Sequence, residues 1–310
     1  MGHSDAAVNG KSNKLKDYLQ LTKPSLNIMV GFSSVICYQM APGIVETDGI
    51  MILLLFIAGF LVTGSANAIN MAVEKDTDAL MKRTAKRPVA SGRMAVEEAW
   101  TFAIVTGAIG IFILGYFFNW LSAGLAAFSL FLYAFVYTPL KKVNAIAVLV
   151  GAFPGALPCL IGWAAGNDSV FETNHGWRDY GGWVLFAIQF LWQFPHFWAI
   201  AWVAHKDYST AGFKLLPAEK GPTKFTAMQT VVYAVLMLPV CILPYIIRLT
   251  EYETTTGAIS FGLVIAANVF LVMQCVRLYR EMDVKAARRV MFSSYIYLPV
   301  VLLALLASKA

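Results

Sequence analysis

Nine apolar segments, each long enough or nearly long enough to cross a bilayer, constrain this chain more than any other feature. They occupy residues 25–42, 49–72, 98–118, 120–138, 143–165, 182–204, 225–247, 257–277 and 289–308. A spanning helix needs about 20 mainly apolar residues. With 58% hydrophobic and 14% charged residues among 310, the chain is too apolar for an ordinary soluble domain. We therefore expect an all-α, multi-pass membrane protein, with an N-terminal segment at 1–24 and a single transmembrane domain at 25–308.

The basic residues predict the orientation of these segments. If the N-terminus is cytoplasmic, the inner side holds 21 of the 24 Lys and Arg residues, and only Arg178, Arg248 and Lys309 remain outside. The positive-inside rule selects this topology. It places residues 73–97, 139–143, 205–224 and 278–288 on the cytoplasmic face. The net charge of +6 then indicates anionic lipid and an anionic substrate at one membrane face rather than nucleic acid.

The N-terminal 24 residues contain no apolar stretch followed by a small-residue cleavage site, and the first arginine is Arg83. We therefore expect neither a cleaved signal peptide nor an Arg-rich organellar presequence. This favours a bacterial inner membrane and leaves a processed organellar form open. All four cysteines lie inside apolar segments without a CxxC pair, so we expect them to be packing residues.

A polar ladder begins near the end of the second apolar segment. Asn70, Glu74 and Asp78 are spaced i, i+4, i+8, so on a continuing helix they fall within about 80° of one face. Carboxylate and amide oxygens suit magnesium. A cluster of basic residues follows at once, and such groups bind phosphate oxygens. A basic loop alone would be read as a topology anchor. Beside buried acids, it predicts a magnesium-diphosphate site in which the candidates for phosphate contact are Lys82, Arg83, Arg87, Lys142 and Lys206.

The sixth apolar segment carries a second group of polar and aromatic residues. Gln193, Pro195 and His196 lie within it. Proline cannot donate a backbone hydrogen bond, so we expect a kinked or opened helix just before His196. A histidine there often serves only helix–helix hydrogen bonding, and aromatic residues often form an interfacial belt. The density of aromatic side chains also suits a large flat or isoprenoid ligand. The loop after this segment again combines acidic and basic residues, so we expect one site shared by the two corresponding loops.

These stretches resemble the protoheme IX farnesyltransferases, or heme O synthases, of the UbiA-type intramembrane prenyltransferases. The resemblance covers nearly the whole chain. Its motifs are LTKP at 21–24, NxxxExxxD at 70–78, MKRTxxRP at 81–88, YTPLKK at 137–142, VGAFPGALPCLIGW at 150–163, WQFPHFWAIAWVAHKDYSTAGFKLLP at 192–217 and FSSYIYLP at 292–299. It implies a bundle of nine transmembrane helices. The first motif departs from the superfamily's NDxxDxxxD at Met71 and Glu74, and the second acidic motif is thinner, with His196, Lys206 and Asp207 in that region.

The resemblance implies transfer of a farnesyl group from farnesyl diphosphate to the vinyl group of protoheme IX, with water addition, giving heme O. Heme would then be a substrate, and Mg²⁺ the cofactor. Asn70, Glu74 and Asp78 would hold the metal, with Asp207 as a further candidate ligand. The product would pass to heme A synthase or terminal oxidase assembly. The acceptor region would comprise His196, Trp192, Gln193, Trp198 and Tyr208.

Several alternatives stay open at this level. Another acceptor, such as a quinone precursor or chlorophyllide, would suit the same donor site, and a transporter with broken helices is a further class. Against a transporter, the charges gather at one membrane face rather than at the midplane. His196 could act as iron ligand, propionate partner or water positioner. The length of the prenyl donor and the number of magnesium ions are also undetermined.

Overall fold

The computed structural model describes residues 13–171, 174–218 and 221–310. Residues 1–12, which include half of the expected N-terminal segment 1–24 and Lys11, lie outside it. Within these ranges the chain is helical, and its only bridge between extended residues joins Thr250 and Lys309. The helices are α1 (Lys14–Thr22), α2 (Pro24–Met40), α3 (Gly49–Val73), α4 (Lys75–Leu80), α5 (Val96–Phe117), α6 (Trp120–Phe131), the π-helix η1 (Leu132–Tyr137), α7 (Thr138–Leu140), α8 (Ala147–Asn167), the 3-10 helix η2 (Gly176–Tyr180), α9 (Gly181–Val203), α10 (His205–Thr210), α11 (Lys224–Ile246), α12 (Thr255–Glu281) and α13 (Val284–Ala307).

Eight of the nine expected apolar segments coincide with single long helices, and the segment at 120–138 coincides with the continuous run of α6, η1 and α7. The bounds differ by at most five residues. Eight spans in the described ranges are long and apolar enough to cross a membrane. The segment expected at 25–42 is α2, which has 17 residues and is shorter than the usual spanning length. The all-α membrane fold is therefore confirmed, and the count of nine spans stays a prediction.

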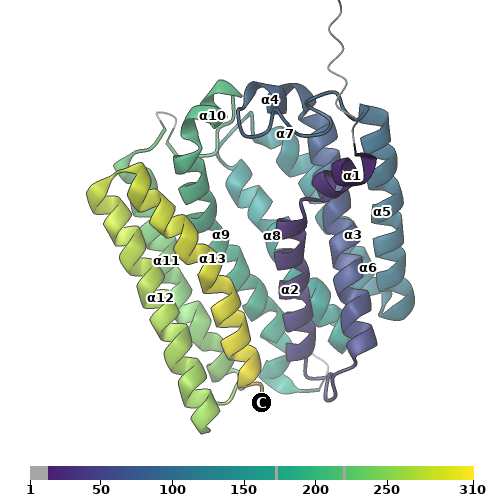
Figure 1. The fold of residues 1–310 in the computed structure, drawn as a ribbon. Coiled ribbons are helices and arrows are strands. Elements are labelled where there is room, and N and C mark those ends of the chain that lie inside the picture. Colours follow the sequence, from purple (N-terminus) through teal and green to yellow (C-terminus); the bar gives the residue numbers. More distant parts are fainter. Residues whose placement is uncertain (1–12, 172–173, 219–220) are drawn as a thin grey trace, which may run out of the picture.

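The long helices form one bundle in which the short helices α4, α7 and α10 lie together at one end, near α1, and the C-terminus lies at the other end (Figure 1). α3 packs mainly on α5, α2 on α8, α8 on α9, and α12 on α13. A Cβ at Gly162 would overlap the carbonyl oxygen of Ser34, so this glycine lets α2 and α8 approach closely.

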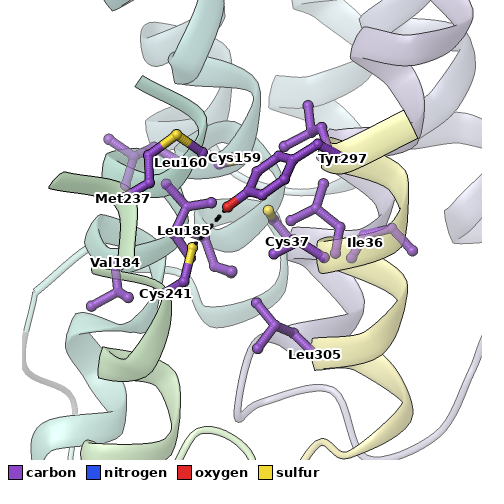
Figure 2. Packing of buried hydrophobic residues seen from close by; sticks show 14 of the residues in the cluster. Ile36, Cys37, Cys159, Leu160, Val184, Leu185, Met237, Cys241, Tyr297 and Leu305 are labelled. Carbon is purple, nitrogen blue, oxygen red and sulfur yellow. Dashed lines mark hydrogen bonds between the residues drawn. The ribbon is translucent and has the colours of Figure 1, made fainter. Parts of the chain in front are cut away.

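The core is built from apolar side chains and a few paired polar groups. All four cysteines are buried free thiols, which confirms the expectation that they are packing residues. Cys241 Sγ lies 3.0 Å from the hydroxyl of Tyr297, the contact drawn as a dashed line in Figure 2. That hydroxyl donates to Asn268 Oδ1 at 3.0 Å, so the thiol is the donor to the tyrosine. The contact links α11 to α13 within the buried core.

The α9 helix runs without interruption through Pro195 from Gly181 to Val203. The expected opening just before His196 is therefore absent. In this part of α9, two side-chain amides instead donate hydrogen bonds to backbone carbonyls of α8. Gln193 Nε2 donates to Ala152 O at 2.9 Å, and Gln189 Nε2 donates to Gly155 O at 2.7 Å. These bonds fasten α9 to α8.

Candidate active site

The polar ladder spans the junction of α3 and α4. α3 ends at Val73, and Glu74 separates it from α4 with φ −92° and ψ 14°. The helical hydrogen-bond pattern nevertheless continues, because Glu74 N–H donates to Asn70 O at 2.9 Å and Asp78 N–H donates to Glu74 O at 2.7 Å. The i, i+4 spacing therefore still aligns the three side chains. Asn70, Glu74 and Asp78 are all buried, and the expected alignment on one face is preserved across a helix break.

A cation from a different part of the chain lies against each rung of this ladder. Lys141 Nζ is 2.6 Å from Glu74 Oε1, and Arg87 Nη1 is 2.6 Å from Asp78 Oδ2. Lys23 Nζ donates to Asn70 Oδ1 at 3.4 Å. The three cations come from the α1–α2 junction, the loop after α4 and the end of α7. A buried array of two acids and one amide is thus matched by two ion-paired cations and by the amino group of Lys23.

The surroundings of these cations are apolar enough to shift their titration. Burial, together with the positive charges of Arg87 and Lys141, lowers the pKa of Lys23 to about 7. Burial also lowers the pKa of Lys141, although the charge of Glu74 opposes this shift. Lys141 Nζ lies 4.8 Å from the ring centre of Tyr137 and 5.6 Å from that of Phe213. These aromatic faces favour the charged lysine.

Three buried polar atoms of the ladder have no hydrogen bond among the described residues, namely Asn70 Nδ2, Glu74 Oε1 and Asp78 Oδ1. Glu74 Oε1 has its ion pair with Lys141, so Asn70 Nδ2 and Asp78 Oδ1 are the two left without a partner in the described ranges. An unpaired buried carboxylate oxygen is costly unless another group completes it. The described chain contains no cluster of three or more His, Cys, Asp or Glu that could hold a metal. A magnesium ion here would therefore have only two carboxylates and one amide as protein ligands. This small oxygen set fits an ion that also keeps water and phosphate oxygens.

The junction between α9 and α10 repeats the backbone geometry of the ladder without its acids. Ala204 has φ −95° and ψ 14°, close to the values at Glu74. Its N–H donates to Ile200 O at 2.9 Å, and Tyr208 N–H donates to Ala204 O at 3.0 Å. The residues at the positions equivalent to the ladder are therefore Ile200, Ala204 and Tyr208. Asp207 lies one residue out of register, so the candidate further metal ligand does not occupy a ladder position.

Side-chain contacts join the two corresponding loops. Arg83 Nη2 donates to the hydroxyl of Tyr208 at 3.2 Å, and its guanidinium carbon lies 5.7 Å from the ring centre. Burial raises the pKa of this tyrosine, so it stays a neutral partner. Met81 also packs with Ala211 and Phe213. The two corresponding loops are thus brought together through Arg83 and Met81.

The remaining basic candidates are distributed differently from the sequence expectation. Lys82, Lys142 and Lys206 are exposed, whereas the neighbouring Lys141 is buried and paired with Glu74. Sequence reasoning missed Lys141 as a site residue, and it missed Lys23. The motifs LTKP and YTPLKK contain these two lysines, and they are the sequence signal that could have identified them as site residues.

The expected acceptor region divides into separate places around α9. Trp192 stacks on His196, with ring centres 4.5 Å apart, and both rings contact α13. Gln193 donates its side-chain hydrogen bond to the backbone of α8, as described above. Trp198 packs on Phe194 and Tyr233 and lines a cavity of about 270 Å³ between α8, α9 and α11. Tyr208 belongs with Arg83. Of the five candidates, the structure groups His196 with Trp192, and it packs Tyr208 against the apolar cluster that contains Trp198.

Comparison with known proteins gives a consistent family. Residues 30–296 match the model of the UbiA prenyltransferase family. A Protoheme IX farnesyltransferase of Cytophaga hutchinsonii is 41% identical over 96% of this chain and 99% of that protein. Another, from Bradyrhizobium diazoefficiens, is 35% identical over 94% and 89%.

Solved structures share the fold at lower identity. One described as digeranylgeranylglyceryl phosphate synthase has a TM-score of 0.74 at 21% identity, covering 96% of this chain and 99% of that one. A UbiA homolog from Archaeoglobus fulgidus bound to GPP and Mg2+ has a TM-score of 0.65 at 15% identity, covering 93% and 99%. These likenesses establish the architecture.

Proposed function

The chain belongs to the UbiA prenyltransferase family, and we propose that it transfers the farnesyl group of farnesyl diphosphate to the vinyl group of protoheme IX. The vinyl π electrons form a carbon–carbon bond to farnesyl C1 as the C1–O bond breaks, and diphosphate leaves with the electron pair. Water then adds to the resulting carbocation and loses a proton. The products are heme O and diphosphate. Relatives named Protoheme IX farnesyltransferase support this choice of acceptor.

The observation that carries the donor half of the proposal is the ladder matched by cations. Asn70, Glu74 and Asp78 would hold Mg²⁺, which supplies Lewis-acid neutralisation of the leaving diphosphate. Arg87 and Lys141 neutralise the two carboxylates without ligand. When a metal and an anionic diphosphate occupy the site together, these cations can turn to phosphate oxygens, because charge-assisted contacts of this kind are strong. The cations then contact phosphate oxygens instead of carboxylate oxygens, and the net charge of the site remains close to zero.

Several other groups of this chain would support the same step. Lys23 lies at the amide end of the ladder and adds a third cation. Arg83, held by Tyr208, offers a planar fork to the diphosphate. The exposed Lys82, Lys142 and Lys206 would attract the anion to this face rather than contact it.

The acceptor half of the proposal is supported by the geometry of α9. His196 lies seven residues before the end of α9, about 10 Å along the helix axis. That end leads directly into α10, which carries Tyr208 beside Arg83. An imidazole flanked by aromatic rings is thus located below the diphosphate region, on the apolar side, where a porphyrin could lie.

The cellular setting follows from the same proposal. The chain is a multi-pass membrane protein, and its bacterial relatives support a bacterial inner membrane. The anionic substrate would enter from the cytoplasmic face, where the basic residues gather. We propose that heme O leaves by handover to heme A synthase or to terminal oxidase assembly, because the added farnesyl chain keeps the product in the bilayer.

Purified protein, farnesyl diphosphate, protoheme and Mg²⁺ provide the test. We expect release of diphosphate that depends on the porphyrin, together with a product heavier by one farnesyl group and one hydroxyl group. Parallel reactions with a quinone precursor or chlorophyllide examine the alternative acceptors, and geranyl and geranylgeranyl diphosphates examine the donor length. Diphosphate release with a quinone precursor and none with protoheme would overturn the proposed acceptor.

A further inference from the structure

The hydrogen bonds of Ser294 determine which nitrogen of His196 carries the proton. Ser294 Oγ lies 2.6 Å from Met291 O, to which it donates, and 2.8 Å from His196 Nδ1. A serine hydroxyl has a single proton. Two oxygens 2.6 Å apart require that proton between them. Nδ1 must therefore be the donor in its contact with Ser294 Oγ, and in a neutral imidazole Nε2 keeps a free lone pair.

The same serine also fixes how the imidazole ring is oriented. Trp192 Nε1 donates to Ser294 O at 2.8 Å, and the indole stacks on His196 at an interplanar angle of 17°. The ring of Tyr295 is inclined at 75° to the imidazole, with ring centres 5.0 Å apart. The ring of Phe197 is inclined at 61°, with ring centres 5.3 Å apart. A flip of the imidazole would break the bond to Ser294 while leaving it between the same aromatic walls. The direction of Nε2 is therefore set jointly by α9 and α13.

This tautomer distinguishes the three roles considered for His196. A partner for a porphyrin propionate must donate a hydrogen bond, and an unprotonated Nε2 can only accept one. A protonated ring would be buried with the hydroxyl of Ser294, and no carboxylate, as its polar contact among the described residues. A positioned water needs two to four polar partners, whereas the rings around His196 are Trp192, Phe197 and Tyr295, and the indole N–H is already engaged. A neutral imidazole that donates through Nδ1 and offers Nε2 is the form that ligates a metal.

We propose that Ser294 is a positioning residue that holds His196 in the Nδ1–H tautomer, so that Nε2 ligates the iron of the porphyrin substrate. This inference rests on the porphyrin acceptor proposed above. Coordination involves no change of covalent bonds and leaves the oxidation state of the iron as it arrives. Its effect is to anchor the macrocycle on α9, next to the stacked Trp192, so that one vinyl group can be held toward the donor.

The test titrates two porphyrins into the purified full-length protein in detergent. Ferric protoheme has an iron for His196 to ligate, and metal-free protoporphyrin IX has none. We expect His196→Ala to remove the histidine-ligated absorption spectrum of protoheme. Ser294→Ala should weaken protoheme binding about 10- to 100-fold, the usual effect of losing a partner behind a metal ligand. Neither change should alter the affinity for protoporphyrin IX by more than about twofold.

Control variants separate positioning from folding. Ser293→Ala removes a hydroxyl one residue earlier on the same helix and should bind protoheme as the wild type does. Ser294→Thr restores a hydroxyl and, after reduction of the bound protoheme to the ferrous state, should recover the iron–histidine stretching frequency, which Ser294→Ala should lower. Binding of a non-hydrolysable farnesyl diphosphate analogue should stay unchanged in all variants, as it would in a folded protein.

Three outcomes would overturn the inference. An unchanged protoheme spectrum in His196→Ala would show that another group ligates the iron, while the proposed reaction would stand. Equal losses for both porphyrins in Ser294→Ala would show that the serine supports the shape of the cavity rather than the ligand. Absence of any protoheme binding by the wild type would overturn the porphyrin acceptor together with this inference.

Discussion

The carboxylates of the ladder differ from ordinary buried acids because each already has a cation partner. The contacts Glu74–Lys141 and Asp78–Arg87 are both 2.6 Å long, and none of the four side chains is more than 18% exposed. Removing one partner of a buried pair costs about 3–5 kcal/mol. The pairs therefore keep the charges in place, while the unpartnered Oδ1 of Asp78 leaves a lone pair for a further ligand.

Asp78→Asn should reduce prenyl transfer by about 100-fold or more, the order expected when a group that stabilises developing charge is lost. The protein should remain folded, because Arg87 keeps some access to solvent. Asp76→Asn makes the same chemical change at an exposed position of α4 and should retain activity. Diphosphate release at saturating Mg²⁺ measures both variants. Near-normal turnover of Asp78→Asn would show that the ladder is only structural.

Two adjacent lysines provide a matched comparison for the diphosphate contact. Lys141→Met should raise the dissociation constant for farnesyl diphosphate about 10-fold or more, because it removes a charge-assisted contact in a buried site. Lys142→Met should change it little, since that side chain is exposed. Titration calorimetry with a non-hydrolysable analogue gives both values. Similar losses in the two variants would mean that only general positive charge matters.

The ladder could be predicted from the sequence because its three residues belong to one helical period. The identity of the cations could not. Lys141 and Lys142 differ by one residue, and their directions depend on the short helix α7 and the π-helix before it. Lys23 is 47 residues from Asn70, so only the packing of α2 on α3 reveals the contact. Partner choice of this kind depends on tertiary structure rather than on local pattern.

Among the elements, α1 is fastened to the loop that carries Arg83 and Arg87. Arg93 Nε donates to Asp17 Oδ1 at 3.0 Å, and Arg93 Nη2 donates to Gln20 Oε1 at 3.0 Å and to Lys86 O at 3.1 Å. One guanidinium therefore connects the amphipathic first helix to the backbone of the diphosphate loop. The exposed face of α1 includes Leu15 and Leu19, which suits a position at the membrane surface.

Arg93→Gln should loosen both elements. Hydrogen bonds to a charged group contribute about 1.5–3 kcal/mol when shielded, and solvent screening lowers this because Arg93 is 32% exposed. We expect hydrogen exchange in residues 81–93 to accelerate by about 10-fold, with a higher KM for farnesyl diphosphate. Lys16→Gln, an exposed change on α1, serves as the control. Unchanged exchange in Arg93→Gln would show that the loop is held by other contacts.

The α9 helix shows why a dense sequence cluster need not form one site. The acceptor candidates occupy only a few turns, but successive residues of a helix are rotated by about 100°. Trp192 and His196 share a face, whereas Trp198 lies nearly opposite and Gln193 points toward α8. Composition indicated an aromatic region correctly, and the helical period distributed it among three neighbours.

On the scale of the whole molecule, the loops that build the site gather at one end of the bundle. α4, α7 and α10 lie together there, and the C-terminus is at the opposite end (Figure 1). At that opposite end, Lys309 Nζ donates to the carbonyl oxygens of Gln39, Ala41 and Ile44 at 2.6–2.9 Å. Lys309, one of the three basic residues expected outside the cytoplasm, therefore binds backbone carbonyls at the C-terminal end of α2.

The orientation of this bundle in the membrane can be measured on a single helix. Lys214 follows α10, whereas Trp177 lies in η2 immediately before α9, so α9 separates them. Both side chains are exposed. The four native cysteines are buried and should react slowly. Because 21 of the 24 Lys and Arg residues fall on one side of the predicted topology, we expect Lys214 to be cytoplasmic.

Lys214→Cys should therefore react with a membrane-impermeant maleimide only in inverted vesicles, and Trp177→Cys only in right-side-out vesicles. The unmodified protein measures the background from its own cysteines. Labelling of both positions from one side would contradict a membrane-spanning α9, and exchange of the two sides would reverse the orientation. Reversal would place the diphosphate site outside the cytoplasm. The positive-inside argument and the proposed route of the anionic substrate would then fail together, because both depend on the same cluster of basic loops.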